Sequence, residues 1–102
     1  MKTTIQFKSV DDVETIVRVW ATENGFALIE KTVNKRKYKK DGGWFGGITH
    51  YLEIENNGSF YILNAWIKNL WEEWELKGPG VIRTPYRNQI NQLLTLLDIP
   101  RV

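Results

Sequence analysis

Side chains able to do nucleophilic or acid–base chemistry are few in this sequence. His50 is the only histidine, serine occurs only at positions 9 and 59, and there is no cysteine. The sequence therefore has almost none of the residues that a Ser–His or Cys–His nucleophilic system requires. We interpret His50 as a hydrogen-bonded histidine at the edge of the core, because an acid–base role would need a carboxylate such as Glu53 or Glu73 in the same cleft. The lack of cysteine also excludes disulfides and thiolate metal sites.

Carboxylates gather in one short stretch, at Glu72, Glu73 and Glu75. Paired carboxylates can serve general acid–base catalysis or bind a hard cation. No second acidic cluster lies nearby in the sequence, so a solvated edge explains these three better. We therefore predict no catalytic residue, no metal and no cofactor, and we expect a protein that is not an enzyme.

Basic residues gather in one run, at Lys35, Arg36, Lys37, Lys39 and Lys40. These cations could meet phosphates while the nearby Trp44 and Phe45 stack on bases, which makes nucleic-acid binding one hypothesis. The alternative is structural. If Tyr38 faces the core, Lys37 lies opposite Glu53 and forms a cross-strand charge pair, and Lys35 with Glu55 repeats the pairing. The formal net charge of only +2 favours the structural alternative.

A glycine-rich loop, DGGWFGG, spans residues 41–47. It lacks the Gly-Lys-Ser/Thr ending of a phosphate-binding loop. Trp44 and Phe45 on this loop either fold back over the sheet or bind a partner, ligand or membrane surface, because two large aromatics are costly to leave exposed.

Two helices are predicted from apolar spacing and end signals. The first covers 10–24, with Ser9 as N-cap and Asn24-Gly25 as the stop. The second begins with Thr84 as N-cap and Pro85 at the first helical position, and ends at 98–100. Their apolar stripes are Val10, Val13, Val17, Trp20 and Ala21 in the first, and Tyr86, Ile90, Leu93, Leu94 and Leu97 in the second.

Strands are expected at 1–7, 26–40, 48–55, 59–68 and 70–77. The second is interpreted as one long strand, with a bulge expected near Asn34. The last is ambiguous, because Trp71 and Trp74 also suit a helical turn; a strand is favoured. Asn57-Gly58 predicts a two-residue hairpin turn. That turn places Ile54 opposite Tyr61, Leu52 opposite Leu63, His50 opposite Ala65 and Ile48 opposite Ile67 on the core side.

These elements predict a single α+β domain over residues 1–102, in the order β-α-β-β-β-β-α. The strands do not alternate regularly with helices, so we expect an antiparallel sheet of about four to five strands with both helices on one face. The N-terminus has no apolar signal region and no stretch approaches the ~18 apolar residues of a membrane span, so a cytoplasmic location is expected.

Several short motifs resemble those of a group of small uncharacterised bacterial α+β proteins. The matching segments are Trp20-Ala21 through Asn24-Gly25-Phe26, the basic 36–40 run before Gly42, Leu52-Glu53-Ile54, and Ala65-Trp66-Ile67. The stretch 69–82 departs from the group, being shorter and more acidic. The resemblance implies the fold and implies no activity.

The sheet face away from the helices is the predicted binding surface. No predicted element covers it, and it carries Tyr51, Phe60, Ile62 and Trp66, joined by Trp71 or Trp74. A patch of this size is seldom left bare in a monomer. We expect a non-enzymatic interaction module, most simply a homodimer through this face or a complex with another protein, and nucleic-acid binding through 35–40 and 44–45 is the alternative.

Overall fold

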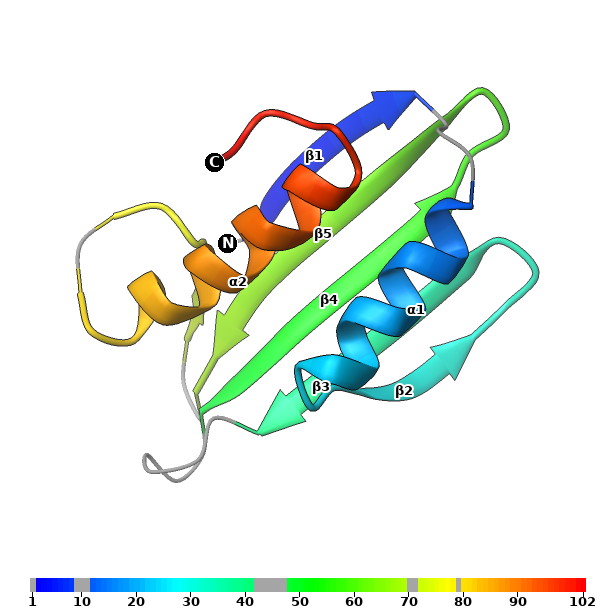
Figure 1. Ribbon diagram of the computed structural model, residues 1–102. Coiled ribbons are helices and arrows are strands. Elements are labelled where there is room, and N and C mark those ends of the chain that lie inside the picture. The colour runs from blue at the N-terminus through cyan, green and yellow to red at the C-terminus, as the bar shows by residue number, and fades with distance from the viewer. Residues whose placement is uncertain (1, 9–11, 42–47, 70–71, 79) are drawn as a thin grey trace.

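The computed structural model describes residues 2–8, 12–41, 48–69, 72–78 and 80–102. In this part of the chain, six strands form one antiparallel sheet and two helices pack on one of its faces (Figure 1). The elements are β1 Thr3–Lys8, α1 Val13–Glu23, β2 Ala27–Lys31, β3 Lys35–Asp41, β4 Thr49–Asn56, β5 Phe60–Lys68, β6 Glu73–Trp74 and α2 Arg83–Leu96. The strands lie in the order β1-β5-β4-β3-β2, and β6 pairs with β5. The predicted fold class is confirmed.

The segment 26–40 is a hairpin rather than one long strand. β2 and β3 pair antiparallel, and the chain reverses at Val33 and Asn34, where the Thr32 N–H donates to the Lys35 carbonyl at 2.9 Å. The register irregularity lies between Leu28 and Glu30 instead of near Asn34. This turn contains neither glycine nor proline, and Asn34 is its one residue of a type common in turns.

The β4–β5 hairpin has the predicted faces but a different pairing. Ile54 lies opposite Leu63 instead of Tyr61. The reason is the turn. The Asn57 N–H donates to the Phe60 carbonyl at 2.8 Å, so the two central residues are Gly58 and Ser59, and only Gly58 has a positive φ, of 87°. Glycine at the first central position is typical of a type II′ turn. A shift of two residues leaves every side chain on its predicted face.

Both helices begin at other residues than the sequence signals indicate. α1 begins at Val13 instead of position 10, and the predicted cap Ser9 lies outside the described residues. In α2, Thr84 is already helical and its N–H donates to the Gly80 carbonyl at 3.1 Å, so it is not the N-cap. Pro85 is tolerated here because the first-turn N–H groups have no partner within the helix.

The core lies between the two helices and the sheet. The described residues of both predicted helical stripes are buried, as are Leu52, Ile54, Leu63, Ala65 and Ile67 on the facing side of β4 and β5. Tyr86 is fully buried, and its hydroxyl donates to the Tyr51 carbonyl at 2.6 Å, which ties α2 to β4. The other face of the sheet has no helix over it among the described elements (Figure 1).

Neither of the two helices that the structure describes is long and apolar enough to cross a membrane.

Candidate functional site

The strand registers bring side chains from five strands together on the sheet face opposite the helices, which we call the outer face. It includes Thr4, Gln6 and Lys8 of β1, Phe60, Ile62, Asn64, Trp66 and Lys68 of β5, Thr49, Tyr51, Glu53 and Glu55 of β4, Lys35, Lys37 and Lys39 of β3, and Ala27 and Glu30 of β2. A polar row crosses its centre: the Thr4 hydroxyl donates to the Asn64 side-chain oxygen at 2.6 Å, and the Asn64 amide donates to a Glu53 carboxylate oxygen at 3.4 Å. These bonds hold the central side chains in one orientation.

An aromatic stack lies beside this polar row. The rings of Tyr51 and Trp66 are stacked at 5.1 Å between centroids. The Lys2 ammonium lies 4.1 Å from the Trp66 ring centroid, and the Lys37 ammonium lies 5.5 Å from it. Trp66 is consequently only 3% exposed within one chain. Its indole is already covered, so a partner would meet Tyr51 and the lysines rather than the face of Trp66.

The predicted interaction residues are only partly brought together. Tyr51, Phe60, Ile62 and Trp66 share the outer face, and the first three are partly exposed. Trp74 lies opposite the buried Ile67 and packs against the core from the helix side, so it is not part of this face. The remaining candidates, Trp44, Phe45 and Trp71, lie outside the described residues.

The basic run does not form one patch. Strand alternation places Lys35, Lys37 and Lys39 on the outer face, but Arg36 and Lys40 on the helix side. Arg36 is tied down there, since its guanidinium lies 3.0 Å from the Glu14 carboxylate and donates to the Thr32 carbonyl at 2.6 Å. Any surface that used this run would meet its residues on two sides of the sheet.

The three lysines of the basic run that lie on the outer face have partners of their own. The Lys35 ammonium lies 3.6 Å from the Glu30 carboxylate, and that of Lys39 lies 4.0 Å from Asp41. Lys37 lies opposite Glu53 and within 5.4 Å of the Tyr51 ring centroid. Lys37 lies opposite Glu53 and Lys35 lies opposite Glu55, as predicted, but among the described residues neither lysine forms an ion pair with that glutamate. The outer face is therefore a surface of mixed charge.

His50 lies on the helix side of the sheet, away from the carboxylates considered for it. Its ring stacks on Tyr86 at 4.5 Å between centroids, whereas Glu53 points to the outer face. Burial, and next the charge of Lys40 on the neighbouring strand, lower the pKa of His50 to about 4. Its Nδ1 is buried and has no hydrogen-bond partner among the described residues, so the hydrogen bond expected for this ring is not made by Nδ1.

The lowered pKa of His50 predicts a loss of stability in mild acid. Between pH 6.5 and about 4 the unfolded chain binds a proton that the folded imidazole does not, so the free energy of unfolding decreases as the pH falls. With allowance for partial exposure, we expect a loss of about 1 to 2 kcal/mol from this group. His50→Phe keeps an aromatic ring on Tyr86 and should remove that part of the pH dependence in urea unfolding. Equal pH dependence in both proteins would contradict the assignment.

Metal binding finds no support in the described ranges, where no three His, Asp or Glu side chains are close enough to hold an ion.

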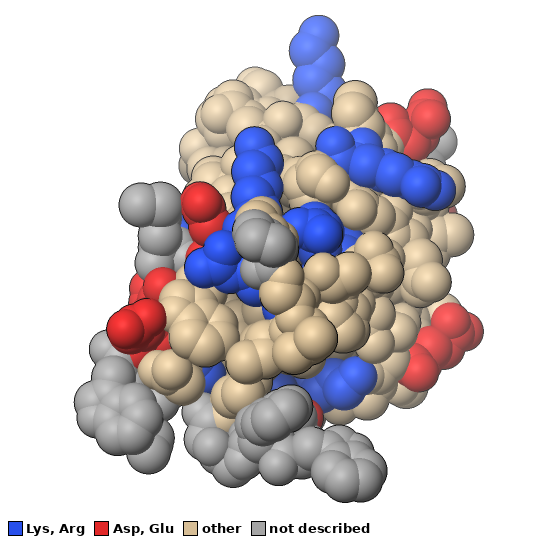
Figure 2. Space-filling model, turned by 90° about the vertical axis from the view of Figure 1, so that its left-hand side faces the viewer, with Lys and Arg blue, Asp and Glu red and all other residues tan. Residues whose placement is uncertain are grey.

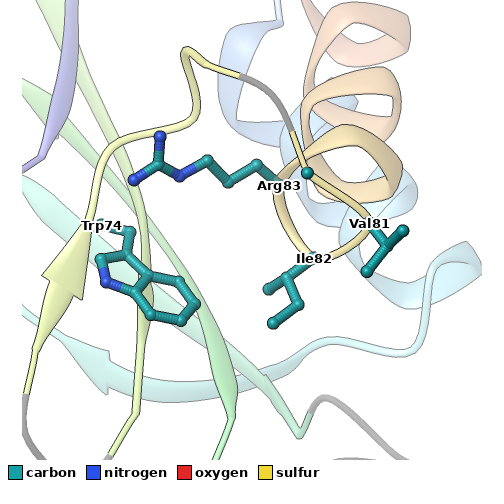
Figure 3. Close-up of a pocket in the computed structure, with 5 residues that line it drawn as sticks. Trp74, Val81, Ile82 and Arg83 are labelled. Atoms are coloured by element: carbon teal, nitrogen blue, oxygen red, sulfur yellow. The ribbon is translucent and has the colours of Figure 1, made fainter.

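A pocket that the sequence does not indicate lies between β6 and the start of α2 (Figure 3). It has a volume of about 370 Å³ and is lined by Trp74, Gly80, Val81, Ile82 and Arg83. Trp74 and Arg83 are nine positions apart, and the path of the connecting chain brings the guanidinium carbon to 6.0 Å from the indole ring centroid. The sequence Gly78-Pro79-Gly80 marks a turn, but only the folded chain shows that Trp74 and Arg83 line one pocket.

No protein-family model, curated protein or solved structure matches this chain, so the resemblance to the group of small bacterial proteins stays a prediction.

Proposed function

We propose that this protein is a non-enzymatic interaction module that associates with a second copy of itself through the outer face. The observation that carries the proposal is the register of β3 and β4, in which Lys35 lies opposite Glu55 and Lys37 lies opposite Glu53. Neighbouring rows of opposite charge form a surface that can be complementary to its own copy. A twofold interface requires this self-complementarity, because both partners contribute the same patch.

The geometry of such a pair follows from the register. A twofold axis parallel to the strands, lying between β3 and β4 in the plane of contact, places β3 of one copy over β4 of the other. Rotation about this axis preserves position along the strands. Lys37 therefore lies over Glu53 of the second copy, and Lys35 lies over Glu55 of the second copy. Each contact occurs twice, and the small twist between packed sheets, about 30°, keeps the rows near each other.

The apolar contribution comes from β4 and β5. Tyr51, Phe60 and Ile62 are partly exposed on the outer face, and an interface core of this kind excludes water around the charged rows. With the strand order β1-β5-β4-β3-β2, the axis between β3 and β4 also places β5 of one copy over β2 of the other and leaves β1 outside the contact. At strand spacings of about 4.8 Å and about 3.3 Å per residue, the four overlapping strands give a face of roughly 440 Å² before the relief of the side chains is counted. Standard interfaces bury about 800 Å² of accessible surface per partner, so this contact is at the small end of the range and fits a weak, reversible dimer.

The nucleic-acid alternative receives less support from this arrangement. Three lysines of the run have intramolecular partners, and the other two basic residues lie on the opposite side of the sheet. Phosphate contacts would have to compete with Glu30, Asp41 and Glu53. A cytoplasmic location is proposed with the interaction function, on the ground that the chain has no cysteine that would form disulfides.

Sedimentation equilibrium of the wild-type protein from about 1 µM to about 1 mM tests the proposal, since this range covers dissociation constants of weak and moderate dimers. We expect a reversible monomer–dimer equilibrium with a midpoint in the micromolar range and no larger species. A protein that stays monomeric throughout the range contradicts self-association through the outer face. Fluorescence anisotropy with single-stranded and duplex oligonucleotides at low salt, run in parallel, reports the alternative directly.

A further inference from the structure

We propose that the pocket between β6 and α2 binds a carboxylate carried on a flat apolar body, either a free aromatic acid or the C-terminus of a peptide. This pocket faces the helix side of the sheet, so the proposal is independent of self-association through the outer face. Its volume of about 370 Å³ is in the range of small-ligand sites.

The walls of the pocket suit a flat apolar group. The Trp74 indole and the Ile82 side chain enter it from opposite sides, one from β6 and one from the turn before α2 (Figure 3). The Trp74 ring is fixed in place, because its indole N–H donates to a Glu72 carboxylate oxygen at 2.7 Å and the ring packs against the core. A ring placed between Trp74 and Ile82 gains stacking contacts without ordering a mobile side chain.

The rim of the pocket supplies the charge that a carboxylate needs. The Arg83 guanidinium is positioned by a 3.0 Å hydrogen bond from Nη1 to the Lys77 carbonyl, and in the described part of the chain no carboxylate lies within ion-pair distance of it. A guanidinium has five N–H donors, so most remain for a ligand, and two of them can bind a carboxylate together. Lys and Arg side chains gather on this flank of the molecule, while Asp and Glu lie mostly toward its borders (Figure 2).

The backbone around Arg83 makes room for this position. Gly78 has a φ of 110°, and a Cβ there would lie 2.4 Å from Arg83 Nη1. Arg87 of α2 also holds this turn, since its guanidinium donates hydrogen bonds to the carbonyls of Leu76 and Gly78 at 3.3 and 2.7 Å. The first turn of α2 contains no acidic residue, so the positive end of the helix adds to the field at Arg83. The guanidinium is therefore held before any ligand arrives.

A titration followed by the indole ¹H–¹⁵N signal of Trp74 tests the proposal. The signal is identified by its absence in Trp74→Phe. We expect 3-phenylpropionate to shift it saturably with a dissociation constant on the order of 1 mM, as befits a fragment of this size. The neutral amide, 3-phenylpropionamide, should bind at least about tenfold more weakly, since it loses the charge-assisted bonds to Arg83. An acetylated tripeptide ending in a free phenylalanine carboxylate serves as the peptide arm, and tighter binding of one arm identifies the source of the carboxylate.

Two variants make the test specific to the pocket. Arg83→Gln keeps a donor for the Lys77 carbonyl and should weaken 3-phenylpropionate about tenfold, whereas Arg101→Gln removes a cation outside the pocket and should leave the affinity unchanged. The spectra of both variants also report whether the fold is intact. Equal affinity for acid and amide, an unchanged affinity in Arg83→Gln, or no saturable shift with either arm would overturn the proposal.

Discussion

Trp66→Ala is expected to lower the free energy of unfolding by about 3 to 5 kcal/mol, the usual loss when a buried tryptophan is truncated. The reason is that Trp66 is covered within one chain by Tyr51, Lys2 and Lys37 and is only 3% exposed. The loss should be the same at any protein concentration at which the chain is monomeric. Urea unfolding of the two proteins, at a concentration well below the midpoint of the monomer–dimer equilibrium, measures it.

Phe60→Ala is the matched control for this prediction, because Phe60 lies on the same strand and the same face but is partly exposed. We expect it to lose about 1 kcal/mol, nearer to the effect of a surface substitution. If both substitutions lowered the free energy of unfolding equally, Trp66 would contribute no more to the fold than a partly exposed outer-face residue. That result would contradict the burial of Trp66 within one chain.

Charge reversal at the centre of the outer face is expected to weaken self-association about a hundredfold or more, because each reversal sets like charges against each other twice in a twofold pair. Glu53→Lys places a lysine over Lys37 of the second copy, and Lys37→Glu places a glutamate over Glu53 of the second copy. Both variants should remain folded, since these side chains lie on the surface of the sheet. Sedimentation equilibrium with a circular dichroism check measures both properties.

Controls for the reversals change the same charges elsewhere. Glu23→Lys alters the exposed face of α1, and Lys77→Glu alters the exposed turn before α2. Neither residue belongs to the outer face, so both controls should dimerise like the wild type. A control that dissociates as much as Glu53→Lys would show that net charge, rather than the register of β3 and β4, governs association.

Much of the fold could be predicted from the sequence because the apolar periodicity of the helices is strong. Val13, Val17 and Trp20 in α1, and Ile90 and Leu94 in α2, are all buried as their spacing indicates. The ends of the helices were harder to predict. Thr84 is of a residue type favoured at the N-cap, but its N–H donates to the Gly80 carbonyl, so Thr84 lies within the helix. The reversal at Val33 and Asn34 has no glycine or proline to mark it.

The sequence predicts which residues lie on the outer face, but it does not predict how exposed each side chain is. Placing the turn at Asn57-Gly58 leaves Trp66 opposite Thr49, whereas the turn at Gly58-Ser59 brings Tyr51 opposite Trp66 and allows the two rings to stack. The contact with Lys2 depends in turn on the pairing of β1 with β5, which places Thr3 opposite Ala65, far away in the sequence. A shift of one residue in a turn thus decides whether the tryptophan is exposed.

The proposed twofold arrangement is tested most directly by mixing the two charge-reversal variants. Glu53→Lys carries lysine at both central positions and Lys37→Glu carries glutamate at both, so each should be monomeric alone at a concentration at which the wild type is a dimer. An equimolar mixture should form a heterodimer in sedimentation equilibrium, because every contact then joins opposite charges. A mixture that stays monomeric while the wild type dimerises, or variants that dimerise alone as well as the wild type does, would contradict the pairing of β3 over β4.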